Sequence, residues 1–558
     1  MKIVGYHAIL NQNGQCVIAN SDGEVCQQPP YTDFLLQDKS ECIKIFYHLN
    51  MAVACLCKAF GFSEYQCKKF FEDGQLYYQG WTFKHRGGKF FSLRWGRHGK
   101  FVNFSDSAQY EDWRLEPNPT IEQVIHKAKD AQRIGREVYD SLRQLDLHPT
   151  SLTSPIRPFA KEVLSKMDIP THDDIPEGVS EYAYMTCRGG WTEAFQKGHF
   201  DKTWDYDLRS CYPFEISKLI DIRPDCGYWK FSKEYIPNAY YGYCKGKITI
   251  NSPFSPILYN PNDDVAFPDL VSRLEASKSR DRDAPVFTPT GIYPSLRHKK
   301  EIEFIKRYGI GDFEFQDGWF FIPKKLTYPL KETVEFLHQH KEQATGRARE
   351  VLKRVPQGLY GLTLQIHESD EDPMGEYFNS VYGSEIENPA RLEVARFVIE
   401  NNLVNDVLHI ATDGVLATKS APVTNEPIMG SWKLSSHGSA IVVSSGIAAV
   451  QGKELTGEFS LSYDWLLEQI KQNPDASEYS MSKWSPISLG VAILQNKFDK
   501  LGQLETLTKT ITIPYELKRS YKEKPKTGGD LLKNKYVSVP RDISQIVSMK
   551  SIMNNVKS

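Results

Sequence analysis

The stretch Thr203-Trp-Asp-Tyr-Asp-Leu-Arg-Ser-Cys-Tyr-Pro-Phe-Glu-Ile216 does most to decide the fold of this chain. It begins with alternating polar and apolar residues and ends in an apolar helix opening, a pattern typical of a strand that passes into a helix. Asp207 stands at this junction. A carboxylate at a strand end can simply be solvated. Asp205 shares the same strand face by the period of two, and we expect it to be a solvated flank.

A second carboxylate lies in a predicted β-hairpin further along the chain. The sequence Val407-Leu-His-Ile-Ala-Thr-Asp-Gly-Val-Leu-Ala-Thr418 surrounds an Asp-Gly turn with apolar and β-branched residues. Because an Asp-Gly turn is common in any hairpin, Asp413 taken alone indicates no function.

Between these segments the sequence predicts a basic helix that runs from Leu330 through Lys353. Its basic side chains suit a triphosphate, although a solvated basic face would have the same pattern. The helix leads into the stretch Lys353-Arg-Val-Pro-Gln-Gly-Leu-Tyr-Gly361. A proline inside a helix costs about 3 kcal/mol or more, so we expect the helix to end or kink just before Gln357.

In their order and spacing, the three segments resemble motifs A, B and C of family B DNA polymerases. Motif A is matched by Asp207-x-x-Ser-x-Tyr-Pro213, motif B by the stretch ending in Tyr360-Gly361, and motif C by Ala411-Thr-Asp-Gly414. The family pattern of motif C is Asp-Thr-Asp-Ser, so its first aspartate is lost here and its second is kept. With gaps, the agreement runs from about residue 182 to about residue 435.

The resemblance implies an α+β multidomain chain with a right-hand polymerase fold of palm, fingers and thumb, preceded by an RNase H-like domain of the exonuclease type. The expected domains are a degenerate exonuclease-like domain over 1–180, palm with motif A over 181–250, an insertion resembling the terminal-protein region over 251–329, fingers with motif B over 330–361, palm with motif C over 362–450, and a thumb with a basic C-terminal segment over 451–558.

The implied activity is template-directed addition of deoxynucleotides. Such a reaction uses two metal ions about 3.5–4 Å apart, and magnesium needs only one or two protein carboxylates beside substrate phosphates. Asp207 and Asp413 are therefore the expected catalytic residues and the expected ligands of two Mg²⁺ ions, with Mn²⁺ as an alternative. The family's nucleotide-binding positions correspond to Lys341, Arg349 and Lys353 for the phosphates, Tyr212 under the sugar, where it excludes ribonucleotides, and Tyr360 under the nascent base pair.

Three further places are expected to contact DNA. Tyr184-Met-Thr-Cys-Arg-Gly-Gly-Trp191 resembles the Tyr-x-Gly-Gly segment that meets the template strand, which assigns DNA contacts to Arg188, Gly189 and Gly190, and Gly361 closes motif B. The segment Leu517–Tyr536 carries seven positive residues against two acids, among them Lys518 and Arg519. It is either a thumb-side segment along the duplex backbone or a disordered solvated tail.

The N-terminal part lacks the acidic motifs of a proofreading exonuclease. Residues 1–10 and 16–20 read as a strand and its hairpin partner, but neither contains Asp-x-Glu, and Asp22-Gly-Glu24 has that spacing only in a predicted turn. Tyr47-His-Leu-Asn-Met-Ala-Val-Ala54 resembles the second exonuclease segment, with alanine and valine where its aspartate belongs. Without carboxylates there is no two-metal hydrolysis. We expect a scaffold or a strand-binding surface without 3'-5' proofreading.

Within the family, the chain resembles the protein-primed branch, the compact polymerases of small phages and linear plasmids, and its length supports that branch. At 558 residues the chain is short for a family B enzyme, and the interval from Asp207 to Lys353 leaves room for an insertion that grips a terminal protein. An irregular insertion with short strands is favoured by four prolines, Pro253, Pro256, Pro261 and Pro268. The expected partners are primer-template DNA, deoxynucleoside triphosphates and a terminal protein. An ordinary 3' end as primer, or none, stays open.

Composition agrees with a cytoplasmic enzyme, in the host cytoplasm if the chain is viral. Hydrophobic residues make up 40% of the chain, net charge is −2, and no apolar run approaches the ~18 residues of a membrane span. The N-terminus lacks a signal-peptide organisation. A second class remains, a catalytically inactive, polymerase-derived nucleic-acid-binding protein. Its support is the set of departures from the family: Ala411, Gln357, Gly414, and Ile447-Ala-Ala449 where the family has a primer-steadying Lys-x-Tyr.

Overall fold

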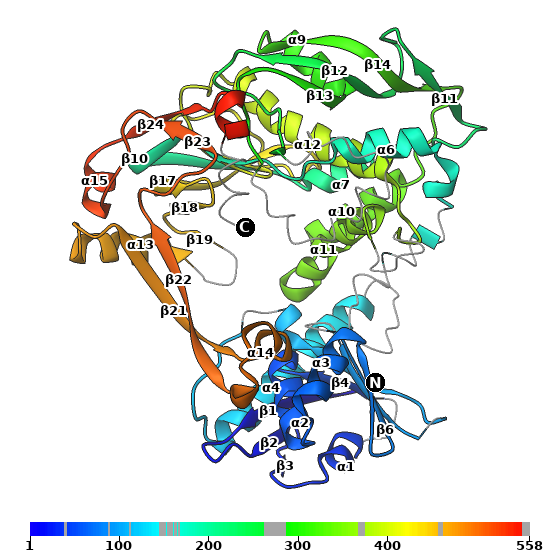
Figure 1. The fold of residues 1–558 in the computed structure, drawn as a ribbon, viewed down its shortest axis with the longest axis vertical. Helices are drawn as coiled ribbons and strands as arrows, with labels where there is room; N and C mark the ends of the chain where they lie inside the picture. The colour runs from blue at the N-terminus through cyan, green and yellow to red at the C-terminus, as the bar shows by residue number, and fades with distance from the viewer. Residues whose placement is uncertain are drawn as a thin grey trace. The chain divides into compact units, whose positions relative to one another are not determined.

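The protein is seen here as a computed structural model, which describes residues 1–37, 42–86, 90–96, 98–110, 113–143, 152, 160, 164–165, 168–261, 286–366, 374–455 and 461–548. The chain divides into two compact units (Figure 1). Unit 1 comprises Met1–Phe159, Gln343–Val355 and Met481–Lys509. Unit 2 comprises Ala160–Glu342, Pro356–Ser480 and Thr510–Ser558.

Unit 1 is built on a mixed sheet of eight strands in the order β3-β2-β1-β4-β8-β7-β6-β5. The first three strands of this order are antiparallel neighbours, whereas β4 runs parallel to β1 and β8 runs parallel to β4. This combination is the RNase H-like arrangement that the resemblance implies. The strands are β1 (Lys2–Leu10), β2 (Cys16–Asn20), β3 (Val25–Cys26), β4 (Cys42–Phe46), β5 (Gln75–Tyr78), β6 (Trp81–Arg86), β7 (Phe90–Trp95) and β8 (Val102–Asp106).

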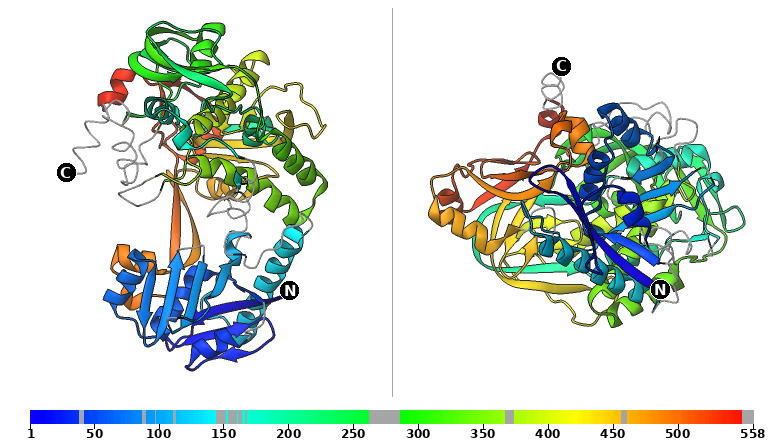
Figure 2. Two further views of the ribbon diagram at one scale, coloured as in Figure 1. Left: turned by 90° about the vertical axis from the view of Figure 1, so that its right-hand side faces the viewer. Right: turned by 90° about the horizontal axis from the view of Figure 1, so that it is seen from below.

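Helices α1 (Tyr31–Leu36), α2 (Leu49–Ala59), α3 (Glu64–Glu72) and α4 (Ile121–Arg143) complete the N-terminal part of unit 1. Figure 2 shows the blue strands of its sheet side by side. Helix α4 packs so closely on β1 that a Cβ at Gly5 would lie 2.0 Å from the carbonyl oxygen of Ala128. Only glycine allows this approach. The predicted strands over 1–10 and 16–20 and the turn at Asp22 and Gly23 are present.

A late segment of the chain also belongs to unit 1. Residues 481–509, which the sequence analysis placed with the thumb, include α14 (Leu489–Gln495). The side chains of Ile487, Leu489 and Ala492 are buried in the hydrophobic core formed by the N-terminal residues. The boundaries expected for the thumb therefore do not coincide with a compact unit.

The palm-like sheet of unit 2 carries both predicted metal ligands. Its strand order is β18-β17-β10-β16-β15-β9, with β24 pairing with β10 and β23 with β24. The strands are β9 (Thr192–Ala194), β10 (Gln196–Leu208), β15 (Val407–Ala411), β16 (Gly414–Ala417), β17 (Trp432–Ser444), β18 (Ile447–Val450), β23 (Arg519–Tyr521) and β24 (Tyr536–Pro540). The expected strand-to-helix passage and the expected hairpin are both observed, with α7 (Cys211–Ile216) following β10.

A second antiparallel sheet of unit 2 has the order β11-β14-β12-β13. Its strands are β11 (Gly227–Ser232), β12 (Tyr241–Ile250), β13 (Gly291–His298) and β14 (Gly311–Pro323). The expected insertion was irregular and began at residue 251, whereas this sheet is regular and begins at β11. Pro253, Pro256 and Pro261 lie in the loop after β12. Residues 262–285 of the expected insertion, with Pro268, lie outside the described part.

The remaining helices of unit 2 are α6 (Glu177–Thr186), α9 (Lys299–Arg307), α12 (Ser380–Glu400), α13 (Tyr463–Gln472) and α15 (Gly528–Lys533). Helix α12 is buried along most of its length and packs on α6, α7 and α9. Two short sheets, β19 (Glu454–Leu455) with β20 (Leu461–Ser462) and β21 (Glu478–Pro486) with β22 (Leu504–Thr512), complete the described strands. None of the described helices is long and apolar enough to cross a membrane.

The predicted single basic helix is two helices, α10 (Lys331–Gln343) and α11 (Gly346–Thr363). Gly346 has a positive φ of 55°, which turns the chain out of α10 before α11 begins. Pro356 lies inside α11, so the helix does not end before Gln357, and the kink that was the alternative expectation stays a prediction. The division between the two units falls directly before this proline.

Candidate active site

Asp207 and Asp413 lie on neighbouring strands at one end of the palm-like sheet. Asp207 is the last residue but one of β10 and pairs with Gly414 of β16. Asp413 occupies the turn between β15 and β16, where its carbonyl oxygen accepts the Leu208 amide at 2.9 Å. The preceding residue, Thr412, has a positive φ of 57°, which closes this tight turn. The structure thus brings the two predicted metal ligands together.

A lysine that the sequence analysis did not single out contacts this pair. The Nζ of Lys433 lies 2.9 Å from the Oδ2 of Asp207, and Lys433 is the residue of β17 that pairs with Asp207. Both side chains are about one third exposed, at 33% and 35%. Sequence alone could not reveal this contact, because the register that sets Lys433 against Asp207 exists only in the folded sheet.

Asp205 is not the solvated flank that we expected. Its side chain is buried, its Oδ2 lies 2.5 Å from the Nζ of Lys453, and the Ser436 hydroxyl donates to it at 3.4 Å. Burial raises the pKa of Asp205, against the opposing effect of Lys453. The bulge that shifts the register between β10 and β17 falls next to it. Because it is paired with a lysine, Asp205 supports the strand that presents Asp207.

The residue that joins β10 to α7 links motif A to the helix of Lys341. Ser210 has a positive φ of 51°, and its hydroxyl accepts from the Nζ of Lys341 at 2.6 Å. His338, one turn earlier on α10, lies 3.1 Å from the same hydroxyl through Nδ1 and 2.8 Å from the Pro427 carbonyl through Nε2. The structure therefore places the first predicted phosphate-binding residue beside motif A.

The other two predicted phosphate-binding residues lie in the part of α11 that belongs to unit 1. Arg349 is half-buried and Lys353 is exposed. Both belong to unit 1, whereas the aspartates belong to unit 2, and their approach to a nucleotide stays a prediction.

Two tyrosines of the predicted nucleotide site pack on each other. The rings of Tyr212 on α7 and Tyr360 on α11 meet edge to face, with 4.8 Å between centroids and 66° between planes. The Tyr360 hydroxyl donates to Oε1 of Glu387, a buried residue of α12. Burial, reinforced by the charge of Glu387, raises the pKa of both tyrosines. Both rings therefore remain neutral hydrogen-bond donors at physiological pH.

The predicted template-contacting loop meets the same carboxylate. The amides of Arg188 and Gly189 donate to Oε2 of Glu387 at 2.9 and 2.8 Å. A Cβ at Gly190 would lie 2.9 Å from Oγ1 of Thr412, so a glycine is required where this loop passes the hairpin turn of Asp413. Nothing in the sequence marked Glu387, because its partners are backbone amides and a phenol from distant segments.

Gly361 lies on the exposed side of α11, and a Cβ placed there would meet no atom within 4 Å. The glycine is therefore accessible, and its contact with DNA stays a prediction.

Arg519 does not belong to an exposed basic surface, contrary to the expectation, because its side chain is buried. Its side chain is only 2% exposed, and its Nη1 lies 2.9 Å from the buried carboxylate of Glu193. The amine of Lys518 is likewise engaged, donating to the Thr192 carbonyl at 2.8 Å, and burial lowers its pKa. The sequence predicted that both residues belong to an exposed basic surface. Charge alone does not reveal which face of a strand is buried.

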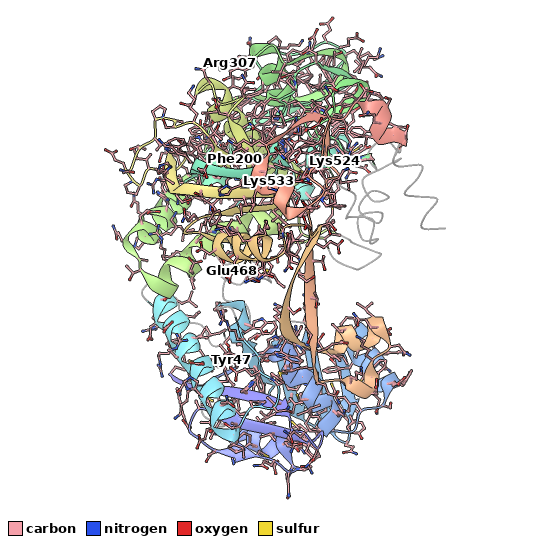
Figure 3. The ribbon with its side chains drawn as sticks, turned by 90° about the vertical axis from the view of Figure 1, so that its left-hand side faces the viewer. Tyr47, Phe200, Arg307, Glu468, Lys524 and Lys533 are labelled. Atoms are coloured by element: carbon pink, nitrogen blue, oxygen red, sulfur yellow. The ribbon has the colours of Figure 1, made fainter. Side chains whose placement is uncertain are left out.

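The rest of the predicted basic segment is folded and exposed, so it is not a disordered tail. Residues 519–540 form β23, α15 and β24 along β10. Figure 3 labels Lys524 and Lys533 with Phe200 of β10, whose ring lies 5.1 Å from the Nζ of Lys535. The exposed lysines of this segment, here called the C-terminal basic surface, are Lys522, Lys524, Lys526, Lys533 and Lys535.

Comparisons with known proteins identify the fold. No known protein family matches the sequence, and no curated protein is similar to it. Among solved structures, phi29 DNA polymerase complexed with primer-template DNA and incoming nucleotide substrates matches 92% of this chain and 100% of its own, with a TM-score of 0.59 and 12% identity. The same polymerase complexed with single-stranded DNA matches equally, at a TM-score of 0.59 and 13% identity over 92% of this chain and 100% of its own. The likeness establishes a right-hand polymerase fold.

Proposed function

We propose that this chain, which has the fold of phi29 DNA polymerase, is a DNA-directed DNA polymerase that adds deoxynucleotides by two-metal phosphoryl transfer. The observation that carries the proposal is the pairing of β10 with β16, which sets Asp207 beside the turn of Asp413. The solved phi29 complexes contain primer-template DNA, single-stranded DNA and incoming nucleotides, and these ligand classes are the ones proposed here.

The two carboxylates fit magnesium ions that bind together with the nucleotide triphosphate. In the described ranges no group of three or more His, Cys, Asp or Glu side chains is placed to hold a metal ion. Two carboxylates are nevertheless sufficient for Mg²⁺ when triphosphate oxygens and water complete its shell. When bound, two such ions neutralise charge on the attacking and leaving oxygens. Asp207 and Asp413 would hold them, and Mn²⁺ would bind the same oxygen ligands.

The chain's own residues then supply positioning and charge. The amine of Lys341, fixed beside Ser210, would meet the triphosphate together with Arg349 and Lys353. The Tyr212 ring, packed on Tyr360, would stand under the sugar and leave no room for a 2'-hydroxyl. The Arg188–Gly190 loop would support the template strand. Catalysis of this kind depends on orientation and on charge neutralisation.

We further propose that the polymerase lacks 3'-5' proofreading. Strand β1 presents His7, a neutral imidazole whose pKa burial lowers to about 3, and no carboxylate of the Asp-x-Glu kind. Asp106, the buried carboxylate of β8, accepts the amides of Leu49 and Ala108 at 3.0 and 3.1 Å, which is a capping role. The test is incubation with single-stranded DNA and Mg²⁺ without nucleotides, where no shortening is expected.

The proposed biological role is replication of a phage or linear plasmid, with priming by a terminal protein. The regular sheet of β11–β14 with α9 is the proposed docking part for that protein. Priming is tested by supplying a linear replicon's terminal protein and a labelled deoxynucleotide without DNA primer. Label transferred to protein supports protein priming. No label on the protein, while a parallel reaction extends an added DNA primer, contradicts it.

One observation favours a second candidate, a catalytically inactive nucleic-acid-binding protein derived from a polymerase. Lys433 neutralises Asp207, the carboxylate on which metal binding depends. The deciding experiment is extension of a labelled primer-template with Mg²⁺ and either all four deoxynucleotides or one at a time. Extension that follows the template sequence supports the enzyme, whereas DNA binding without extension supports the second candidate.

A further inference from the structure

Glu387 is a buried carboxylate whose contacts come from two distant segments of unit 2. One oxygen accepts the Tyr360 hydroxyl, and the other accepts the amides of Arg188 and Gly189. A buried carboxylate is costly unless such donors satisfy it. Each segment thus contributes to a shared polar contact, and removing the carboxylate would release both.

The same helix fixes the loop a second time. Arg391 lies one turn after Glu387 on α12, and its Nη1 donates to the Gly189 carbonyl at 3.2 Å. Residues four apart share one face of a helix. Helix α12 therefore binds both the amide side and the carbonyl side of the Arg188–Gly190 loop.

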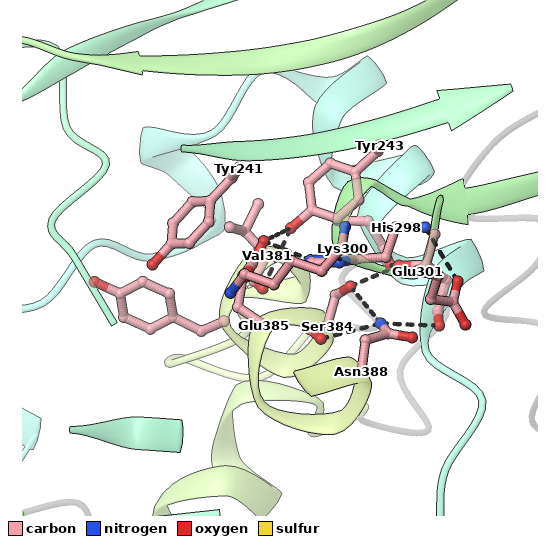
Figure 4. Close-up of polar contacts among 12 residues, drawn as sticks. Tyr241, Tyr243, His298, Lys300, Glu301, Val381, Ser384, Glu385 and Asn388 are labelled. Atoms are coloured by element: carbon pink, nitrogen blue, oxygen red, sulfur yellow. Dashed lines mark hydrogen bonds and ion pairs between the residues drawn. The ribbon is translucent and has the colours of Figure 1, made fainter. Parts of the chain in front are cut away.

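Helix α12 is itself anchored by a buried network on its neighbouring turn. Glu385 lies 2.6 Å from Nε2 of His298 and 2.9 Å from the Nζ of Lys300, as Figure 4 shows. Asn388 donates to the carbonyl and the hydroxyl of Ser384, each at 3.0 Å. Because Glu385, His298 and Asn388 are buried and paired, the turn that carries Glu387 forms a rigid support.

We propose that Glu387 is a positioning residue for nucleotide selection, which holds the nucleotide-side tyrosine Tyr360 and the template-side loop at Arg188 and Gly189 in one fixed relation. This proposal rests on the polymerase function proposed above. The nascent base pair lies between the two surfaces in that function. A correct pair matches their fixed separation, and a mismatched pair does not.

The chemistry of the contact supports this role. The Tyr360 phenol stays protonated because burial and the charge of Glu387 raise its pKa, so it remains a donor. Hydrogen bonds to an ionised acceptor are roughly twice as strong as neutral ones. Without the carboxylate, Tyr360 keeps its ring contact with Tyr212 but loses the bond that ties it to the loop.

The test compares Glu387→Ala with Glu400→Ala, a matched control. Glu400 lies on the same helix and also accepts a tyrosine hydroxyl, from Tyr308 at 2.5 Å, but it is half-exposed. Loss of a charge-assisted hydrogen bond predicts that Glu387→Ala raises KM for the correct deoxynucleotide about tenfold and lowers discrimination against a mismatch about tenfold, with kcat nearly unchanged. Equal KM and equal discrimination in Glu387→Ala and Glu400→Ala would overturn the proposal.

A double variant and a spectroscopic signal separate this role from general stability. In the Glu387→Ala background, Tyr360→Phe should add little further loss, because the two residues form one interaction. In protein labelled with ¹³C at the tyrosine hydroxyl carbon, with Tyr360→Phe for assignment, Glu387→Gln should lower the pKa of Tyr360. An unshifted Tyr360 signal refutes the contact itself. If the unaltered protein adds no nucleotide while that signal shifts, the contact stands but the polymerase function and the selection role are both refuted.

Discussion

The ammonium group of Lys433 lies 2.9 Å from a carboxylate oxygen of Asp207, across the register of β17 and β10. A lysine in this position occupies space beside a ligand on which the proposed reaction depends. Metal binding must therefore displace the ammonium group or share the carboxylate with it. Lys433 thus competes with the metal ion for Asp207, and the effect of replacing this lysine on metal binding can be measured.

Lys433→Met should lower the Mg²⁺ concentration that gives half-maximal extension. A partly exposed ion pair contributes about 0.2–1 kcal/mol, so the expected decrease is up to about fivefold. Lys433→Arg keeps the positive charge and should leave the Mg²⁺ requirement near that of the unaltered protein. A higher Mg²⁺ requirement in Lys433→Met would instead assign Lys433 a direct role in substrate binding.

Tyr212→Val should admit ribonucleotides. The Tyr212 ring is held edge to face against Tyr360, so shortening the side chain opens the space proposed for the 2' position. We expect the preference for deoxynucleotides, measured as the ratio of kcat/KM values, to fall at least about tenfold, since a steric contact of this size is worth 1–3 kcal/mol. Tyr515→Val alters an exposed tyrosine and serves as the control. Unchanged discrimination in Tyr212→Val would remove Tyr212 from the sugar site.

Arg519→Met should destabilise unit 2 without acting through DNA. The substitution leaves the Glu193 carboxylate buried without its charged partner, which costs about 3–5 kcal/mol of unfolding free energy. The measurement is urea unfolding followed by circular dichroism. A Lys524→Met control should change the unfolding free energy by less than about 0.5 kcal/mol, because its side chain is exposed. Equal stability of the two variants would contradict the buried role of Arg519.

The exposed lysines of the C-terminal basic surface, and not the buried Arg519, should make DNA binding dependent on salt concentration. If Lys524 and Lys533 each neutralise a phosphate, the double variant Lys524→Met/Lys533→Met should reduce the slope of log K against log salt by roughly 1.8. Affinity would be measured by fluorescence anisotropy of labelled duplex DNA over a range of salt concentrations. Replacement of Lys306 and Lys325, two exposed lysines outside this surface, is the matched control. An equal slope in the double variant and the unaltered protein would place the DNA elsewhere.

Asp106 should make unit 1 less stable as the pH rises. Burial raises its pKa to about 7, above the usual value of 3.8. Between these values the folded state keeps a proton that the unfolded state has released, so stability falls by up to about 1.4 kcal/mol per pH unit as pH rises from about 4 to 7. Buried His7 and His48, with pKa values lowered to about 3 and 4, act in the opposite direction. The difference between the unaltered protein and Asp106→Asn isolates the effect, and a pH-independent difference would contradict it.

The sequence predicted the centre of the fold well because its signals there are local. The passage from strand to helix at Asp207 and the Asp-Gly hairpin at Asp413 depend on periodicity and turn chemistry within about a dozen residues. The fold that these motifs implied is the fold observed. A helix end before Gln357 was one of two expectations, and it is wrong because packing of the buried side chains in α11 outweighs the cost of an internal proline. The other, a kink at Pro356, stays a prediction.

The features that the sequence missed depend on contacts between distant segments. Lys433 meets Asp207 only through strand register, and Glu387 meets Tyr360 and Gly189 only through tertiary packing. Arg519 was misassigned for the same reason, since its partner Glu193 lies more than three hundred residues earlier. Local patterns carry no information about such pairs.

The most direct test of the account measures addition of a single templated deoxynucleotide by Asp207→Asn and Asp413→Asn in Mg²⁺. Asp201→Asn is the matched control, because Asp201 lies on the same strand β10 with a 91% exposed side chain. Each of the two site variants should lose at least about a hundredfold in rate while binding primer-template DNA as the unaltered protein does, and the control should keep full activity. Full activity in either site variant would contradict the proposed metal pair.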